Sequence, residues 1–211
     1  FQTSPLGSLS IPGPLYSVRV LQVGFNTPNP DGSSRADGSV TLVSGGPLTV
    51  LVDTGGPWLR PLLPRLLQEQ GGVTPADVTH VVVTHGHSDH VGNINLFPSA
   101  TLLVGFDLSR PGGLFVPQGL ARGVPLELHP GHLRVTPTPG HTRAHVSLLV
   151  SGTELGTVAV AGDTFERSGD EGEWEALSEE PAEQRRSRRR LVALADVIVP
   201  GHGEPFRVLG E

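Results

Sequence analysis

The chain has 211 residues, 36% of them hydrophobic, which is enough for a single domain over residues 1–211 with a buried core. Its formal net charge of -6 disfavours binding to a nucleic acid, which is attracted by a net positive charge. It has no cysteine, no long apolar run and no secretory pattern, so the sequence predicts no thiolate metal ligand, no membrane span and a cytoplasmic or nuclear location. Because it also has no methionine, we expect that segments beyond its ends are missing.

The amino-terminal part of the chain predicts strands separated by loops. Residues 1–14 are rich in Ser, Pro and Gly and predict an irregular lead-in, whereas residues 15–24 have the apolar pattern of a strand. Residues 26–39 are turn residues throughout and predict a long loop that borders a site. Residues 40–43 and 48–53 are two apolar runs, which predict a hairpin.

Residues 58–70 predict an amphipathic helix, because leucines recur at helical spacing and two glycines follow. Pro61 and Pro64 lie inside this range. Proline removes a backbone donor and is tolerated best in the first turn. The regular turns are therefore expected to begin near Pro61, or the helix is kinked.

The next part of the chain predicts two strands that flank a helix. Residues 78–83 are mostly β-branched, end in three valines and predict a strand, residues 91–96 predict a short helix and residues 101–104 another strand. Residues 105–123 read as a loop with apolar side chains. That loop is interpreted as a wall of a substrate cleft, as a contact with a partner, or as a cover for its own core.

The carboxyl-terminal part predicts a second sheet and a charged helix. The strands are expected at residues 126–128, 133–136, 146–150 and 157–161, and a last one at residues 197–199. Residues 166–183 hold eight acidic side chains and residues 185–190 hold five arginines. With Pro181 at the first turn, acids near the start and arginines further on, this segment suits the dipole of a helix.

A dense group of metal-binding side chains follows the strand at residues 78–83. It consists of His85, His87, Asp89 and His90. Imidazole and carboxylate groups bind zinc and similar divalent ions at about 2.0 to 2.2 Å. His85 and His87 are two residues apart, so an extended backbone points both rings the same way. Asp89 and His90 are adjacent and must diverge, which suits a second ion beside the first.

Further candidate ligands stand where three other apolar strands end. They are His141, Asp163 and His202, each among small residues. Asp53 also closes a strand, and we interpret it as an outer carboxylate that orients a ligand, with a helix cap as the alternative. The other histidines are interpreted as structural or exposed. His145 is a candidate to orient a ligand, because it follows His141 by four residues.

The order of these motifs, from Asp53 to His202, resembles the metallo-β-lactamase superfamily. The resemblance implies an α/β (α+β) fold, a four-layer αββα sandwich of two mixed β-sheets flanked by helices. It also implies two divalent metal ions, with zinc expected and iron or manganese as alternatives. The first ion would take His85, His87 and His141, the second would take Asp89, His90 and His202, Asp163 would bridge both, and Asp53 would be the outer carboxylate.

The pattern resembles the thioesterase and RNA-processing branches more than the lactamases, which use a cysteine ligand. The resemblance implies an endoribonuclease that cleaves RNA at histone pre-mRNA 3′ ends and acts as a homodimer. Two ions would supply a metal-bound hydroxide as the nucleophile. Asp89 would orient this nucleophile, and Asp163 would hold both ions.

Two other activities stay open. Residues 138–145 are close to the pattern of glyoxalase II, with Ala144 where a glycine is usual, so a thioester hydrolase is the first alternative. An iron-dependent sulfur dioxygenase, which uses a single ion at the site of the first ion, is the second. A non-catalytic binding module is disfavoured by the intact ligand set.

The arginine cluster gives the only sequence signal for an RNA contact. Arg188, Arg189 and Arg190 are predicted to contact phosphates, because a few arginines can supply RNA affinity that does not depend on sequence. The alternative is a solvated helix face neutralised by the acidic run before it.

Overall fold

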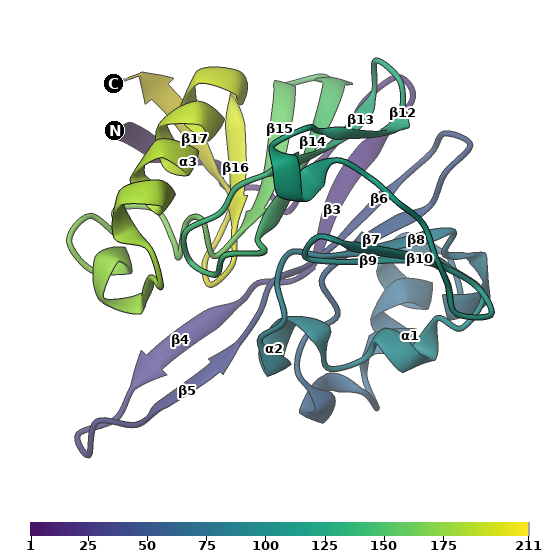
Figure 1. The fold of residues 1–211 in the computed structure, drawn as a ribbon, viewed down its shortest axis with the longest axis horizontal. Helices are drawn as coiled ribbons and strands as arrows, with labels where there is room; N and C mark the ends of the chain where they lie inside the picture. The colour runs from purple at the N-terminus through teal and green to yellow at the C-terminus, as the bar shows by residue number, and fades with distance from the viewer. Residues whose placement is uncertain (211) are drawn as a thin grey trace.

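The structure is a computed structural model that describes residues 1–210 (Figure 1). One sheet has the strand order β1 (Gln2–Pro5), β17 (Phe206–Gly210), β16 (Val197–Pro200), β15 (Gly156–Gly162), β14 (Val146–Thr153), β13 (Leu133–Pro137) and β12 (Leu126–His129). The other has the order β11 (Leu114–Phe115), β10 (Asp107–Arg110), β9 (Thr101–Val104), β8 (His80–Val83), β7 (Val50–Val52), β6 (Val40–Ser44), β3 (Ser17–Gln22) and β2 (Ser10–Ile11). The other two strands form the hairpin β4 (Phe25–Pro28) and β5 (Ser34–Asp37), and the α-helices are α1 (Leu63–Leu66), α2 (Ser88–Val91) and α3 (Pro181–Leu194), beside several short 3-10 or π-helical turns.

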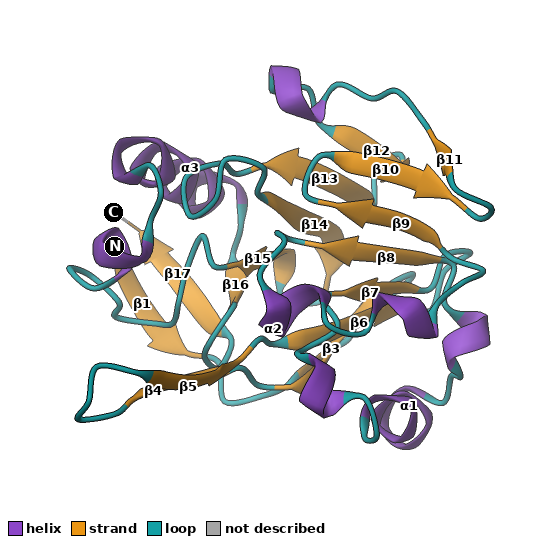
Figure 2. Ribbon diagram, turned by 60° about the horizontal axis from the view of Figure 1, so that its bottom comes forward, coloured by secondary structure: helices purple, strands orange, loops and turns teal. Residues whose placement is uncertain are grey.

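Three apolar clusters define the layers of the molecule. Alternate residues of a strand point to opposite faces of a sheet. On β8, Val82 belongs to the cluster between the two sheets, whereas Val81 and Val83 belong to a cluster that includes Leu63 and Leu67 near α1. On β16, Ile198 packs in a third cluster with Leu191 of α3. The predicted four-layer sandwich is therefore confirmed, with α3 outside one sheet and α1 and α2 outside the other (Figure 2).

Both sheets are mixed, as predicted. In one, β15 and β16 run parallel, and in the other β7, β8 and β9 run parallel, while the other pairs are antiparallel. Parallel neighbours end at the same edge of a sheet, so the segments after β7 and β8, and after β15 and β16, are brought side by side. Those segments carry the predicted metal ligands.

The predicted strands at residues 15–24, 40–43, 78–83 and 101–104 form as β3, β6, β8 and β9. The predicted helix at residues 58–70 is shorter and irregular. Regular α-helical turns begin only at Leu63, with Pro64 in the first turn, and a π-helical segment, Leu67–Gly71, follows. The expected position near Pro61 is thus two residues early.

Three segments predicted as irregular form strands. Residues 1–14 contain β1 and β2, and residues 105–123 contain β10 and β11. The predicted loop at residues 26–39 is the hairpin β4–β5, which projects from the body of the molecule (Figure 1). Its strands carry few apolar side chains and are held by backbone pairing, so alternating hydrophobicity does not reveal them.

Within residues 1–210, no helix has both the length and the apolar character needed to cross a membrane.

α3 begins at Pro181, as predicted, with Glu183 in its first turn. Acidic groups near the amino end of a helix are favoured by its dipole. The inner face of α3 is polar as well as apolar, because Gln184, Ser187 and Arg188 are buried on it.

Candidate metal centre

The predicted ligands meet at one edge of the sandwich. β8 leads into residues 84–90, β15 into Asp163, and β16 into His202, while His141 lies in the connection between β13 and β14. Close approach of these segments requires glycine at position 201, because a Cβ there would lie 1.8 Å from Oδ1 of Asp163. The small residues seen around each motif in the sequence therefore make room for the side chains of the neighbouring motif.

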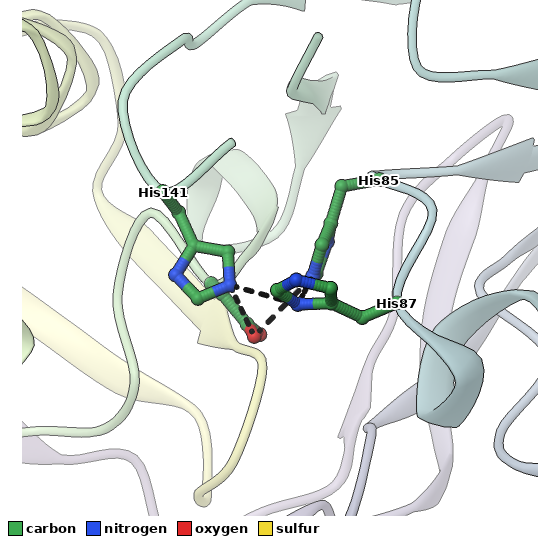
Figure 3. Close-up of side chains that lie close together, drawn as sticks. His85, His87 and His141 are labelled. Carbon is green, nitrogen blue, oxygen red and sulfur yellow. Dashed lines mark hydrogen bonds and ion pairs between the residues drawn. The ribbon is translucent and has the colours of Figure 1, made fainter. Parts of the chain in front are cut away.

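His85, His87, His141 and Asp163 form the first donor group, in which one donor atom from each lies within 4.8 Å of the others. Nε2 of His85 is 2.9 Å from Nδ1 of His87, which is 3.2 Å from Nε2 of His141. Oδ2 of Asp163 is 3.2 Å from that Nε2. Figure 3 shows the rings of His85, His87 and His141 facing one another. Donors about 2.0 to 2.1 Å from one tetrahedral ion are about 3.3 Å apart, so these spacings fit a zinc-like ion.

Asp89, His90 and His202 form the second donor group. Oδ2 of Asp89 is 3.0 Å from Nε2 of His202 and 3.7 Å from Nε2 of His90. The other oxygen of Asp163, Oδ1, lies 3.3 Å from that nitrogen of His90. One carboxylate therefore faces both groups, with one oxygen toward each.

The donor atoms fit divalent ions in a second respect. Nε2 of His90 and Oδ1 of Asp163 face each other at 3.3 Å, but within the described residues neither of these buried atoms makes a hydrogen bond. Leaving such atoms unsatisfied costs about 1 to 3 kcal/mol each. Nitrogen and carboxylate donors without cysteine suit zinc, iron or manganese, and ions at these positions would satisfy both atoms.

The charges of the centre favour cations. Burial lowers the pKa of His85 well below its ordinary value, which leaves its ring neutral and able to ligate. Burial alone would also lower the pKa of His90 and His202, but the Asp163 carboxylate raises the pKa of His90 well above its usual range and that of His202 to about 10. The same two rings hold the pKa of Asp163 well below its ordinary value, against the effect of burial. The carboxylates thus draw positive charge to the second donor group.

Asp53 lies behind His90. Its Oδ2 accepts a hydrogen bond of 2.8 Å from Nδ1 of His90, and its two oxygens accept bonds of 2.7 and 2.9 Å from the amide and hydroxyl of Thr84. The bond to Nδ1 turns Nε2 of His90 toward Asp163. The helix-cap alternative does not hold, since the following 3-10 turn, Pro57–Leu59, has Gly56 as its N-cap and no side-chain cap bond.

We expect Asp53→Ala to lower metal affinity or activity about 10- to 100-fold, because loss of a partner that orients a ligand has effects of this size. The loss should fall more on turnover than on metal content at saturating zinc. Elemental analysis and a hydrolysis assay on the same preparation measure both. Asp53→Asn is the matched control for shape, since it keeps an acceptor for Thr84. Unchanged turnover in both variants would contradict this role of Asp53.

Glu166 is not predicted from the sequence as a site residue, but it contacts two of the ligand histidines. Glu166 is 3% exposed, its Oε2 is 2.9 Å from Nδ1 of His202, and its Oε1 is 3.7 Å from Nδ1 of His141. It also forms a possible donor group with Asp163 and His202. Glu166 follows Asp163 by only three residues, which is the one indication of its role in the sequence. The same run, residues 166–183, contains seven other acidic residues, so the sequence does not distinguish Glu166 from them.

His145 lies where the sequence interpretation placed it, beside the ligands. Its ring stacks on that of His85 with centroids 5.0 Å apart and an interplanar angle of 25°. Its Nδ1 is 3.0 Å from the hydroxyl of Thr138. Burial lowers the pKa of His145 well below its ordinary value. A neutral ring packed in this way fixes the orientation of His85.

The prediction that Arg188 contacts RNA is wrong. Its side chain is 2% exposed and donates to both oxygens of Asp170, at 2.9 and 2.6 Å, and to the carbonyl of Thr164 at 3.0 Å. Presenting this guanidinium to a phosphate would leave Asp170 buried and unpaired. Arg189 and Arg190, the next two residues of α3, are exposed. Those two remain candidate phosphate contacts.

The comparisons with known proteins agree with this architecture. The family described as the metallo-beta-lactamase superfamily matches residues 35–106. Metallo-beta-lactamase domain-containing protein 1 of Xenopus laevis is 56% identical over 210 residues, which cover 99% of this chain and 89% of that protein. The protein of the same name from Homo sapiens is 52% identical over 241 residues, covering 100% of this chain and 90% of that protein.

A solved structure shares the fold at lower identity. It is an N-acyl homoserine lactone hydrolase with N-hexanoyl-L-homoserine bound at its catalytic metal centre, 18% identical, with a TM-score of 0.67 over 92% of this chain and 94% of that chain. This likeness concerns the fold alone. The relatives that are more than half identical over nearly their whole length decide the family. The chain therefore belongs, with the proteins called metallo-β-lactamase domain-containing protein 1, to the metallo-β-lactamase superfamily of metal-dependent hydrolases.

Proposed function

We propose that this protein is a metal-dependent endoribonuclease that hydrolyses phosphodiester bonds of single-stranded RNA, with histone pre-mRNA 3′ ends as its substrate. The observation that carries the proposal is the position of Asp163, whose oxygens lie 3.2 Å from Nε2 of His141 and 3.3 Å from Nε2 of His90. Paired ions are typical of enzymes that displace a phosphodiester in line, because both the attacking and the leaving oxygen are stabilised. The resemblance to RNA-processing members of the superfamily supports RNA as the polymer.

The exposure of the donor residues defines the side from which a substrate approaches. His85, His90 and Asp163 are buried, whereas His87 is exposed and Asp89 is half-buried. A phosphodiester would therefore reach the centre past His87 and Asp89. There the Asp89 carboxylate can accept a hydrogen bond from the attacking water and so orient it. Divalent ions bound at the two donor groups would lower the pKa of that water and stabilise the charge that develops on the phosphoryl oxygens.

The alternatives use parts of the same centre. An activated water attacks a carbonyl carbon as well as phosphorus, so a glyoxalase-II-like thioester hydrolase is the runner-up, supported by the sequence of residues 138–145. A sulfur dioxygenase needs only the first donor group. The second group, with Asp89, His90 and His202 drawn together, favours hydrolysis over that oxidation.

Cleavage assays on the zinc-loaded protein test the proposal. We expect endonucleolytic cuts in single-stranded RNA carrying a histone pre-mRNA 3′ end, loss of these cuts after chelation, and recovery when zinc is returned. Matched assays should use a thioester and a DNA of the same sequence. If the protein hydrolyses the thioester but never cuts RNA, the thioesterase replaces the endoribonuclease. Activity that requires iron and consumes oxygen would instead establish the dioxygenase.

The partners and location implied by the resemblance and the sequence stay predictions. We infer a homodimer from the resemblance alone. Exposed Arg189 and Arg190 are proposed to add phosphate contacts that weaken with salt. A cytoplasmic or nuclear location would bring the protein to its proposed substrate.

A further inference from the structure

A hollow of about 330 Å³ lies between the hairpin β4–β5 and the 3-10 turn Pro57–Leu59. Phe25, Ser34, Arg35, Ala36 and Trp58 line it. Both of its aromatic side chains are open to solvent, with Phe25 47% and Trp58 59% exposed. The volume is at the lower end of the range of about 300 to 1,000 Å³ found for small-molecule sites. The hollow is therefore large enough for a planar group that covers these rings.

The hairpin that forms the hollow is attached to the metal centre. Beyond the end of β5, the amide of Gly38 donates to the carbonyl of Asp89 at 3.1 Å, and that of Ser39 donates to the carbonyl of Gly201 at 2.8 Å. A Cβ at Gly38 would lie 2.8 Å from the ring of His90, so the backbone passes directly against a predicted ligand. The chain that leaves the second strand of the hairpin is therefore hydrogen-bonded to the two loops that carry the second donor group, one with Asp89 and His90 and the other with His202.

The other wall of the hollow is fixed to the same hairpin. Asp37, which pairs with Phe25 at the base of the hairpin, accepts a hydrogen bond of 2.8 Å from the amide of Gly56. The indole of Trp58 lies against Gly56, where a Cβ would come within 2.2 Å of the ring. The two aromatic side chains are therefore held by a connected backbone frame next to the centre.

We propose that this hollow binds a nucleobase of a single-stranded RNA, stacked on Trp58 and Phe25, so that a neighbouring phosphodiester reaches the metal centre. The inference rests on the proposed function and adds to it how the strand is held. Unpaired bases are commonly recognised by stacking on aromatic side chains, which tolerates any base sequence. Arg35 lines the same hollow, and its charge complements the phosphate that accompanies a bound base.

The test compares two probes on the zinc-loaded protein, a labelled uridine oligomer and an abasic ribose-phosphate oligomer of the same length, by fluorescence anisotropy. Trp58→Ala and Phe25→Ala should each weaken binding of the uridine oligomer about 5- to 150-fold and leave binding of the abasic oligomer unchanged. Trp58→Phe keeps a stacking ring and should keep the affinity. Leu62→Ala is the control, since Leu62 is 42% exposed close to Trp58 in sequence but does not line the hollow.

Intrinsic fluorescence gives a second readout. The chain has two tryptophans, and Trp174 is only 5% exposed. Binding of the uridine oligomer should therefore quench the indole emission of the parent, while Trp58→Phe binds the oligomer without that quenching. A purely structural role of Trp58 would not produce this difference.

The outcomes separate the hollow from the catalytic proposal. If the parent cuts RNA, and Trp58→Ala and Phe25→Ala bind and cut it equally well, the hollow is not a base site although the endoribonuclease stands. If Trp58→Ala weakens both oligomers equally or lowers the metal content, Trp58 is structural and the inference is overturned. If the parent cuts RNA carrying a histone pre-mRNA 3′ end but does not bind the uridine oligomer, the base site fails and the endoribonuclease stands. If it neither binds the uridine oligomer nor cuts that RNA, both proposals fail together.

Discussion

Asp163→Ala is expected to remove metal from both donor groups and to abolish activity, because one carboxylate faces both. Its oxygens lie between 3.2 and 3.6 Å from nitrogens of His141, His85, His90 and His202. Since replacing an outer partner of a metal ligand typically costs about 10- to 100-fold, loss of this inner group should cost more. Elemental analysis gives the number of ions per chain, and hydrolysis of the parent's substrate gives the activity.

The stability of the same variant gives an independent check. An ion present at about 1,000 times its dissociation constant stabilises a folded protein by about 4.1 kcal/mol. For a chain of this size, each kcal/mol changes the melting temperature by about 2 to 4 °C. Added zinc should therefore raise the melting temperature of the parent but not that of Asp163→Ala. A variant that keeps two ions and full activity would show that Asp163 does not bridge them.

Arg188→Ala is expected to destabilise the fold strongly, whatever its effect on RNA. Breaking a buried ion pair by removing one partner costs about 3 to 5 kcal/mol, because the other charge stays buried and unpaired. Here the stranded group would be Asp170, which is 1% exposed and also accepts a 2.9 Å hydrogen bond from the amide of Glu166. Thermal unfolding should show a drop of roughly 6 to 20 °C.

The neighbouring arginine is the matched control for this experiment. Arg189 is exposed, so Arg189→Ala should change the unfolding free energy by no more than about 0.5 kcal/mol. A double variant, Arg188→Met with Asp170→Leu, removes both charges and should recover much of the lost stability. An Arg188→Ala protein as stable as its parent but weaker in RNA binding would return Arg188 to the surface role predicted from sequence.

Arg188 and Arg189 also illustrate which features of the site can be predicted from the sequence. The strand ends were predictable, because each apolar run is followed within a few residues by a ligand type, and this pattern is local. Whether Arg188 or Arg189 turns inward depends on the phase of α3 against its sheet, and the buried partner Asp170 comes from a segment read only as acidic. The role of Glu166 was hidden for the same reason. Its partner His202 is 36 residues away.

The strands likewise differ in whether their local sequence predicts them. Strands with strong apolar patterns, such as β8 and β14, were placed within a few residues. Strands such as β1, β4 and β5 are not predictable in this way, because they are short and polar and are defined by their pairing partners rather than by burial. The one among these that matters most for the substrate is the hairpin, whose turn residues at 29–32 are equally compatible with an irregular loop.

The wide separation of the donors along the chain sets the order of events during biosynthesis. Asp89 and His202 are 113 residues apart, and the loop that holds His202 connects β16 to β17. A ribosome makes the chain from its amino end, so His85 and His87 emerge long before the residues that complete either donor group. Closing loops of this length slows folding. Because the donors of each group follow strands of both sheets, a group is complete only when the two sheets have come together, so an ion that needs the whole group can bind only to the assembled sandwich.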